Sequence, residues 1–231
     1  MPTVLVTGSN RGLGLEFSRQ YAAKGWDVVA CTRQPGQAQE LNSLAQHCDT
    51  IRVEALDVAD LDQIQKLSNK LSTLSIDILV NNAGVYDDQR GNGFGQLDYP
   101  KWLHSFTVNT LAPMKMAESF LPQIKSGNKK LVVNISSLMG SMADNNSGSS
   151  ILYRSSKAAL NAAMKSLSID LKSQGIGVLI LHPGWVQTDM GGMNALIDAK
   201  TSVQGMCEVI DRFNLSQTGA FIKYDGTPMP W

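Results

Sequence analysis

The sequence predicts one doubly wound α/β domain with a seven-stranded, mainly parallel sheet and helices on both faces. Short apolar runs without polar alternation are typical of strands buried on both sides, and segments with helical spacing of apolar residues separate them. The chain has 231 residues, of which 43% are hydrophobic, so it can bury a sizeable core. No break in composition divides it, and we expect residues 1–231 to form a single domain.

Composition narrows the classes of partner. Lys plus Arg and Asp plus Glu both number 20, and no basic run is present, so nucleic acid is not expected. Cys31, Cys48 and Cys207 are widely spaced and lack a metal-ligand pattern, so they are expected to be reduced thiols, and no metal is expected. Neither a secretory leader nor an 18-residue apolar stretch is present, which predicts a cytoplasmic protein without membrane insertion.

A glycine-rich turn follows the first expected strand. The apolar run Thr3–Val6 leads into TGSNRGLG at Thr7–Gly14 and then into a pattern with helical spacing. In a strand, turn and helix of this kind, Gly8 permits the tight turn, Gly12 lets the backbone approach a pyrophosphate, and Gly14 lets the helix pack closely. The helix N-terminus then points at the phosphates. This order predicts a Rossmann-type dinucleotide site, although a glycine-rich strand end can also be only a turn.

The end of the second expected strand, Asp27–Thr32, indicates which dinucleotide binds. An acidic side chain there would accept hydrogen bonds from ribose hydroxyls and repel a 2′-phosphate, but this chain has Thr32 followed by Arg33. Arg33, together with Arg11 of the glycine-rich turn, is able to hold a 2′-phosphate through charge-assisted hydrogen bonds. We therefore expect NADP(H) rather than NAD(H). The alternative is that both are ordinary surface arginines.

Strands and helices continue to alternate through the middle of the chain. A mobile loop is expected at Tyr86–Gly95, which is polar and rich in glycine. One long helix is expected at Lys101–Lys125, with Pro113 kinking or loosening it and Asn109 in an unfavourable mid-helix position that indicates a role. The other elements expected here are a helix around Leu41 and Leu44, a strand at Ile51–Leu56 before Asp57 and Val58, a helix at Leu61–Leu71, a strand at Ile76–Val80 before Asn81–Gly84, and a strand at Leu131–Ile135.

The stretch from Ser136 to Lys157 carries the clearest chemistry. If a helix runs from about Tyr153 onward, Tyr153 and Lys157 lie on one face, one turn apart. A nearby ammonium group favours the phenolate and lowers a tyrosine pKa, so the pair is a candidate proton donor and acceptor. A hydroxyl of Ser136 or Ser137 can donate a hydrogen bond to a carbonyl oxygen. Taken alone, a half-buried aromatic beside a solvated lysine and two capping serines would explain the same residues.

The last third of the chain supplies a second loop at the same sheet edge. Residues 182–190 read HPGWVQTDM, in which Pro183 and Gly184 break the strand and Thr188 can reach a nicotinamide amide or a phosphate. His182 is expected to be structural, because no nucleophile or metal-ligand partner accompanies it. The remaining expected elements are a strand at Ile176–Leu181, a helix at Val203–Phe213, and a strand and turn at Ala220–Gly226.

Together these motifs resemble the short-chain dehydrogenase/reductase superfamily, in its compact single-domain branch, over essentially the whole chain. The run HPGWVQTDMGG and the final YDGTPMPW are similar to those of the C-factor and sniffer-type carbonyl reductases. The motifs that carry the resemblance are TGSNRGLG at Thr7–Gly14, Asp57 with Val58, NNAG at Asn81–Gly84, Asn109, NISS at Asn134–Ser137, YRSSK at Tyr153–Lys157 and PGWVQT at Pro183–Thr188.

The resemblance implies roles for four catalytic residues. Tyr153 would be the general acid/base, and Lys157 would lower its pKa and hold the nicotinamide ribose. Ser137 would orient the substrate carbonyl, and Asn109 would hold a water in a proton relay. The implied cofactor-binding residues are Gly8, Ser9, Asn10, Arg11, Gly12, Leu13, Gly14, Arg33, Asp57, Val58, Asn82, Ala83, Gly84, Tyr153, Lys157, Pro183, Gly184, Val186 and Thr188.

Two spacings refine the resemblance. Ser137 is preferred over Ser136 because the family's serine lies three residues before a glycine, here Gly140. That serine is usually thirteen positions before the tyrosine, whereas sixteen positions separate Ser137 from Tyr153. The three extra positions fit an insertion in residues 142–150, over the substrate mouth. They affect the inference of the substrate rather than that of the catalytic residues.

The predicted function is therefore reversible, NADP(H)-dependent hydride transfer between a small carbonyl compound and its alcohol. An NADP(H)-binding signalling protein with little turnover is the alternative. A sugar-nucleotide epimerase with the same Tyr/Lys pair is a weaker one, because about 40 residues after Thr188 leave little room for a nucleotide-sugar subdomain. From the family alone, a homodimer or homotetramer formed through the two long helices is expected.

Overall fold

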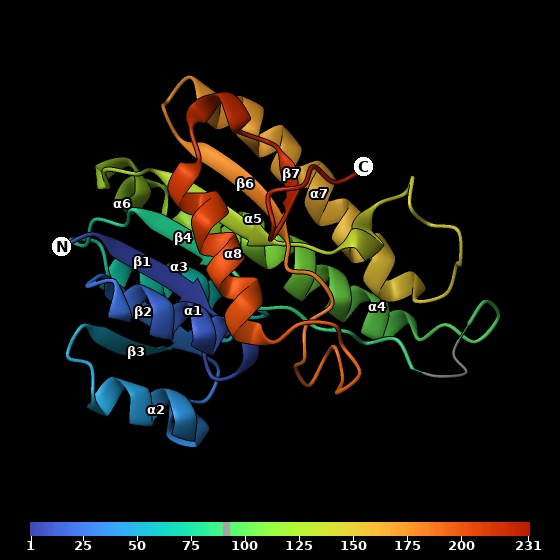
Figure 1. Cartoon of the computed structure of the whole chain (residues 1–231), viewed down its shortest axis with the longest axis horizontal. Helices are drawn as coiled ribbons and strands as arrows, with labels where there is room; N and C mark the ends of the chain where they lie inside the picture. Colours follow the sequence, from blue (N-terminus) through green and yellow to red (C-terminus); the bar gives the residue numbers. More distant parts are fainter. Residues whose placement is uncertain (90–92) are drawn as a thin grey trace.

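A computed structural model describes residues 1–89 and 93–231 of the chain. Its strands form one seven-stranded sheet in the order β3-β2-β1-β4-β5-β6-β7, in which every strand pairing is parallel (Figure 1). This confirms the predicted doubly wound α/β fold. The strands are β1 (Thr3–Thr7), β2 (Asp27–Thr32), β3 (Ile51–Ala55), β4 (Ile78–Asn81), β5 (Leu131–Ile135), β6 (Gly177–His182) and β7 (Phe221–Lys223).

Helices cover both faces of this sheet (Figure 1). They are α1 (Gly12–Ala23), α2 (Gln39–Gln46), α3 (Leu61–Lys70), α4 (Tyr99–Phe106), α5 (Ala112–Ser119), α6 (Leu121–Ser126), α7 (Ile151–Lys172) and α8 (Ala199–Arg212). Apolar side chains of α3, α5 and α7 pack on the face that bears Leu5, and those of α1, α2 and α8 pack on the face that bears Val4 and Val6. Successive side chains of β1 are thus buried on opposite faces, which explains why the strand is a continuous apolar run.

The strand order reverses next to β1, which pairs with β2 on one side and with β4 on the other. Because all strands are parallel, the loops that follow β1, β4, β5 and β6 leave the sheet at the same edge. A crevice at such a reversal, outside the carboxyl ends of the strands, is where doubly wound sheets bind ligands. The fold therefore gathers the predicted site residues at one edge.

The single helix predicted over Lys101–Lys125 is wrong. The structure divides this region into α4, a π-helical turn at Thr107–Leu111, α5 and α6. Pro113 has no N–H to donate to the carbonyl of Asn109, and the N–H of Ala112 bonds to the carbonyl five residues earlier. The predicted loosening near Pro113 is therefore present, but it lies in the turn before the proline and contains Asn109.

Two smaller differences concern the segments around the site. Helix α7 begins at Ile151, two residues before the predicted start at Tyr153. The mobility predicted for Tyr86–Gly95 falls partly on residues 90–92, which lie outside the described residues. Within the described parts of the chain, no helix has the length and hydropathy needed to span a membrane.

Candidate active site

The glycine-rich turn after β1 is shaped by close backbone contacts. Gly8 has a φ of +70°, and a Cβ atom there would lie 3.0 Å from the Cα atom of Ala83. A Cβ atom on Gly14 would lie 2.2 Å from the carbonyl oxygen of Gly8, closer than packed atoms can approach. Arg11 precedes α1 and gives it no side-chain cap, so first-turn N–H groups remain available to an anion. The turn is therefore suited to a phosphate group.

The loop after β4 is tied to the end of β1. The Asn82 amide nitrogen donates to the Thr7 carbonyl oxygen at 2.8 Å, and the Thr7 hydroxyl accepts from the backbone N–H groups of Asn82 and Ala83. A Cβ atom on Gly84 would lie 3.2 Å from the side-chain oxygen of Asn109 and 3.5 Å from the Lys157 ammonium nitrogen. Gly84 thus brings the predicted cofactor loop against two predicted catalytic residues.

The residues predicted to select the dinucleotide lie near the end of β2. Thr32 is buried and Arg33 is exposed. Arg11 forms an exposed ion pair with Asp189, from the loop after β6, and this pairing was not predicted. In the segment after β3, the Asp57 carboxylate accepts a hydrogen bond from the N–H of Ala59. Among residues 1–89 and 93–231, Arg11 therefore has an ion-pair partner, whereas Arg33 has none.

The loop after β6 reaches the glycine-rich turn. Gly184 has a φ of +86°, as a sharp break of the strand requires. The Thr188 hydroxyl accepts from the N–H of Gly191 at 3.1 Å, and a Cβ atom on Gly12 would lie 3.4 Å from the methyl carbon of Thr188. Ser9 is fully buried and its hydroxyl donates to the Val6 carbonyl at 2.9 Å. The loop after β6 and the glycine-rich turn after β1 therefore lie next to each other at the same edge of the sheet.

Tyr153 and Lys157 lie in the first two turns of α7 and are both buried, with 8% and 4% exposure. The Lys157 ammonium nitrogen is 5.8 Å from the centroid of the Tyr153 ring and donates to the Ile135 carbonyl oxygen at 2.9 Å. Burial raises the pKa of Tyr153 to about 12, although a hydrogen bond with Ser137 opposes the rise. Burial also lowers the pKa of Lys157 to about 8. The pKa of Tyr153 therefore lies above its ordinary value rather than below it, because the effect of burial outweighs the opposing effect of Ser137.

The two serines at the end of β5 have different partners. The Ser136 hydroxyl is buried and donates to the side-chain oxygen of Asn161 at 2.6 Å. The Ser137 hydroxyl accepts from the N–H of Met139 and lies close enough to the Tyr153 phenol to oppose the rise of its pKa. A Cβ atom on Gly140 would lie 2.9 Å from backbone and side-chain atoms of Lys157, so this glycine permits the loop to pack on α7. Of the two hydroxyls, the one of Ser137 faces the tyrosine.

Asn109 is fully buried at the π-helical turn. Its side-chain oxygen accepts from the N–H of Val85, and its nitrogen donates to the Val85 carbonyl and to the Ser156 hydroxyl at 2.9 and 3.0 Å. The asparagine therefore ties the segment after Gly84 to helix α7, a long-range role that its sequence position did not reveal.

Three neighbours of these residues were not singled out as site residues. The Tyr86 ring lies 5.0 Å from the Tyr153 ring, and Asp88 accepts from the backbone N–H of Tyr153 at 2.8 Å. The imidazole of His182 accepts from the N–H of Leu138, next to Ser137, at 3.2 Å. These contacts could not be predicted from local sequence patterns, because they join residues more than forty positions apart. Among residues 1–89 and 93–231, no group of three or more His, Cys, Asp or Glu could hold a metal ion.

Comparisons with known proteins agree with this geometry. A family model for short chain dehydrogenases matches residues 2–195. The chain is 42% identical over 168 residues to C-signal of Myxococcus xanthus. This match covers 73% of this chain and 100% of that protein.

Among solved structures, the carbonyl reductase Sniffer of D. melanogaster has a TM-score of 0.92 and 34% identity, with 100% of both chains covered. An NADPH-bound carbonyl reductase from chicken fatty liver has a TM-score of 0.91 and 34% identity, with 100% of this chain and 99% of that chain covered. The family match spans most of the chain and the structural matches span all of it. The chain therefore belongs to the short-chain dehydrogenase family of oxidoreductases.

Proposed function

We propose that this protein is an NADP(H)-dependent carbonyl reductase, in which Tyr153 is the proton donor and Ser137 binds the substrate oxygen. The observation that carries the proposal is the position of the Tyr153 phenol. It lies beside the Ser137 hydroxyl and one helical turn from Lys157, at the sheet edge that also holds the glycine-rich turn. The NADPH bound to the chicken carbonyl reductase supports the choice of cofactor.

The glycine-rich turn fits a dinucleotide on its own geometry. Gly8 and Gly14 leave no room for a side chain between the turn and the loop after β4, and the N-terminus of α1 has no side-chain cap. When bound, the nicotinamide would supply hydride to the carbonyl carbon. The residues proposed to hold the cofactor are Gly8, Ser9, Asn10, Arg11, Gly12, Leu13, Gly14, Arg33, Asp57, Val58, Asn82, Ala83, Gly84, Tyr153, Lys157, Pro183, Gly184, Val186 and Thr188.

Tyr153 is suited to donate a proton in the reductive direction. Because burial raises its pKa to about 12, the phenol of the free protein carries its proton at neutral pH. The pKa of Lys157 is about 8, so its ammonium is also protonated at pH 7 and would stabilise the phenolate that remains after donation. The Ser137 hydroxyl would donate a hydrogen bond to the substrate oxygen as negative charge develops on it.

Asn109 is proposed to support proton transfer to Tyr153 through Lys157. Its amide bonds to Val85 and Ser156 hold the loop after Gly84 against α7, where the Lys157 ammonium lies. A water held near this asparagine would connect Lys157 to solvent, which would restore the proton on Tyr153 after each turnover.

One relative favours a second function. C-signal is named for signalling, and it is 42% identical to this chain over 168 residues, which are 73% of the chain. A protein that binds NADP(H) as a signal, with little turnover, would need the cofactor residues but not the Tyr153 proton. Cofactor binding alone therefore does not distinguish the two functions, and turnover does.

The test is a screen of NADPH oxidation by the wild-type protein over quinones, aldehydes, diketones and ketosteroids, repeated with NADH. The proposal predicts turnover of at least one carbonyl class, with NADPH preferred. Tight NADPH binding without turnover of any class would support the signalling function instead. No binding of either dinucleotide would contradict both.

A further inference from the structure

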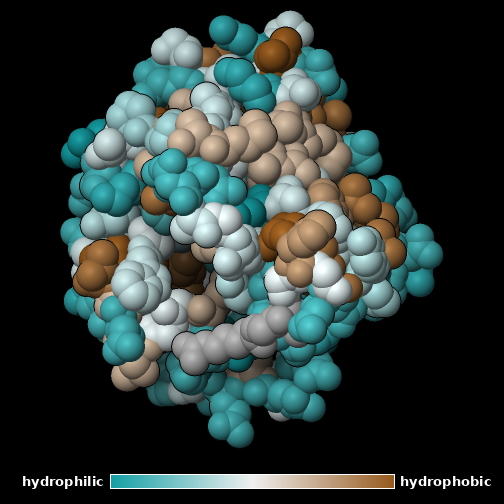
Figure 2. Space-filling view, turned by 90° about the vertical axis from the view of Figure 1, so that its right-hand side faces the viewer, coloured by the Kyte–Doolittle hydropathy of each residue, from teal (hydrophilic) through white to brown (hydrophobic). Residues whose placement is uncertain are grey.

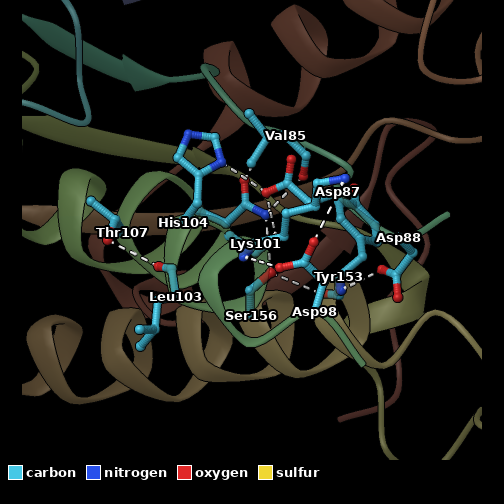
Figure 3. A network of polar contacts seen from close by, with 12 residues as sticks. Val85, Asp87, Asp88, Asp98, Lys101, Leu103, His104, Thr107, Tyr153 and Ser156 are labelled. Atoms are coloured by element: carbon cyan, nitrogen blue, oxygen red, sulfur yellow. Dashed lines mark hydrogen bonds and ion pairs between the residues drawn. The ribbon is translucent and has the colours of Figure 1, made fainter. Parts of the chain in front are cut away.

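The four residues after Gly84 all bond to segments that surround Asn109 and Tyr153. We call Val85–Asp88 the clamp segment, and Figure 3 shows Val85, Asp87 and Asp88 of this segment close to His104 and Tyr153. Within the described residues, its hydrogen-bond partners lie on the π-helical turn, on α4 or at the start of α7. Val85 bonds with Asn109, Tyr86 with Ser150, Asp87 with His104 and Ser105, and Asp88 with Leu152 and Tyr153.

Asp88 provides the N-terminal cap that α7 lacks in its own sequence. Ser150, the residue before the helix, has a left-handed φ of 49° and makes no side-chain cap bond. The two carboxylate oxygens of Asp88 instead accept from the N–H of Leu152 at 3.2 Å and of Tyr153 at 2.8 Å. Figure 3 shows the Asp88 carboxylate beside Tyr153. By contrast, α3, α4 and α8 are each capped by an aspartate directly before the helix.

The rest of the clamp segment keeps this aspartate in place. The Asp87 carboxylate accepts from the Ser105 hydroxyl at 2.8 Å and contacts His104, both on α4 (Figure 3). The Tyr86 hydroxyl bonds with Ser150 at 2.6 Å, and its ring packs on the ring of Tyr153. At the start of α7, Asp88 therefore binds the backbone, and Tyr86 contacts the side chains of Ser150 and Tyr153.

We propose that Asp88 is a positioning residue that sets the place of Tyr153 for proton transfer. Its carboxylate binds the backbone N–H of the residue whose phenol must reach the substrate oxygen, and a carboxylate is favoured at a helix N-terminus. Because Asp88 lies four residues after Gly84, the cap also links the cofactor loop to the catalytic helix. The catalytic part of this inference rests on the proposed function, whereas the capping part does not.

The test compares Asp88→Ala with Asp60→Ala. The Asp60 carboxylate accepts from two backbone N–H groups at the start of α3, those of Asp62 and Gln63, so both variants lose two backbone bonds at a helix N-terminus. Asp60→Ala also loses the bond that the Gln63 side chain donates to Asp60. The melting temperature, the NADPH Kd and kcat are measured for each variant. Hydrogen exchange of the peptides that contain Tyr153 is measured without cofactor. Asp88→Asn, which keeps one acceptor oxygen, serves if the alanine variant does not fold.

Positioning predicts that Asp88→Ala lowers kcat about tenfold or more, while its NADPH Kd stays within about twofold of wild type. Exchange at the start of α7 should rise only in the Asp88 variants, and Asp88→Asn should recover part of kcat. Asp60→Ala should lower the melting temperature by a comparable amount with kcat near wild type. Equal loss of kcat in both alanine variants, or wild-type kcat in Asp88→Ala, would overturn the proposal.

If wild-type protein shows no carbonyl turnover, the proposed function fails, and hydrogen exchange alone decides the role of Asp88. Faster exchange at Tyr153 in Asp88→Ala, with unchanged exchange there in Asp60→Ala, would then still support the cap. Unchanged exchange in both variants would overturn it.

Discussion

The glycine-rich half of the site, around the turn after β1, and its catalytic half, around α7, are shaped by different kinds of atoms. Around the turn after β1, the shape comes from backbone atoms that approach one another where Gly8 and Gly14 have no side chain. Around α7, the shape comes from buried side chains such as Asn109 and Lys157, which bond to partners distant in the sequence. The first half is therefore sensitive to added atoms, and the second is sensitive to lost polar groups.

The largest expected effect comes from adding one methyl group to the glycine-rich half. Gly14→Ala would place a Cβ atom 2.2 Å from the carbonyl oxygen of Gly8, so the turn and α1 must separate. We expect loss of measurable NADPH binding and a fall in the free energy of unfolding of about 3 kcal/mol, by calorimetry and urea denaturation. Gly36→Ala is the control, because a Cβ atom there meets no atom within 4 Å. Equal behaviour of the two variants would contradict this account.

In the catalytic half, removal of one hydroxyl should separate catalysis from binding. Ser137→Ala removes the group that faces Tyr153, and we expect kcat to fall about a hundredfold with the NADPH Kd nearly unchanged. Ser136→Ala is the matched control, since that hydroxyl bonds with Asn161 away from the tyrosine. It should cost about 1 kcal/mol of stability and little activity. A larger loss of kcat in the Ser136 variant would show that the two serines have been assigned in the wrong order.

A smaller effect is expected at the exposed edge of the glycine-rich half. Arg33→Ala should reduce the ratio of the NADPH and NADH affinities about tenfold, because solvent screens a charged hydrogen bond at an exposed guanidinium. Fluorescence titration with both dinucleotides measures the ratio. Arg212→Ala, at the far end of α8, should leave it unchanged. An unchanged ratio in Arg33→Ala would mean that this arginine does not select the cofactor.

The smallest effect concerns stability rather than turnover. Burial lowers the pKa of His182 from 6.5 to about 4, and its neutral ring accepts from the N–H of Leu138. As pH falls below 6.5, the unfolded chain binds the proton first, so this contribution to stability is present above pH 6.5 and is lost toward pH 4.

His182→Asn keeps an acceptor without titration, and should remove about 2 kcal/mol of the stability change between pH 7.5 and 5 in urea denaturation. His47→Asn is the control, since that ring is exposed and bonds to the Ser43 carbonyl of the adjacent helix α2. An unchanged pH dependence in His182→Asn would show that His182 does not cause this loss of stability.

The comparison also explains which features could be predicted from the sequence. Strands and the glycine-rich turn are local patterns, and the predicted strands are present with boundaries that are identical or differ by one or two residues. The π-helical turn before Pro113 was missed because a missing N–H does not reveal which way the helix will adjust. The contacts of Tyr86 and Asp88 with α7 were missed because they join residues 64 and 65 positions apart, through a segment read only as a loop.

The pKa of Tyr153 shows the same limit. Spacing alone indicated an ammonium four residues away, but not that Lys157 would bond to the Ile135 carbonyl or that burial would dominate the pKa of the phenol. Local spacing therefore indicates which groups are neighbours. The three-dimensional surroundings determine how those groups titrate.

The most direct test of the central claim is to measure NADPH binding and carbonyl turnover in the same preparation of Tyr153→Phe. The substitution removes one hydroxyl from a buried ring and leaves the glycine-rich half untouched. The account predicts a Kd for NADPH within about twofold of wild type and a kcat at least about a thousandfold lower, because the proton donor is gone. Turnover at the wild-type rate in this variant would contradict it.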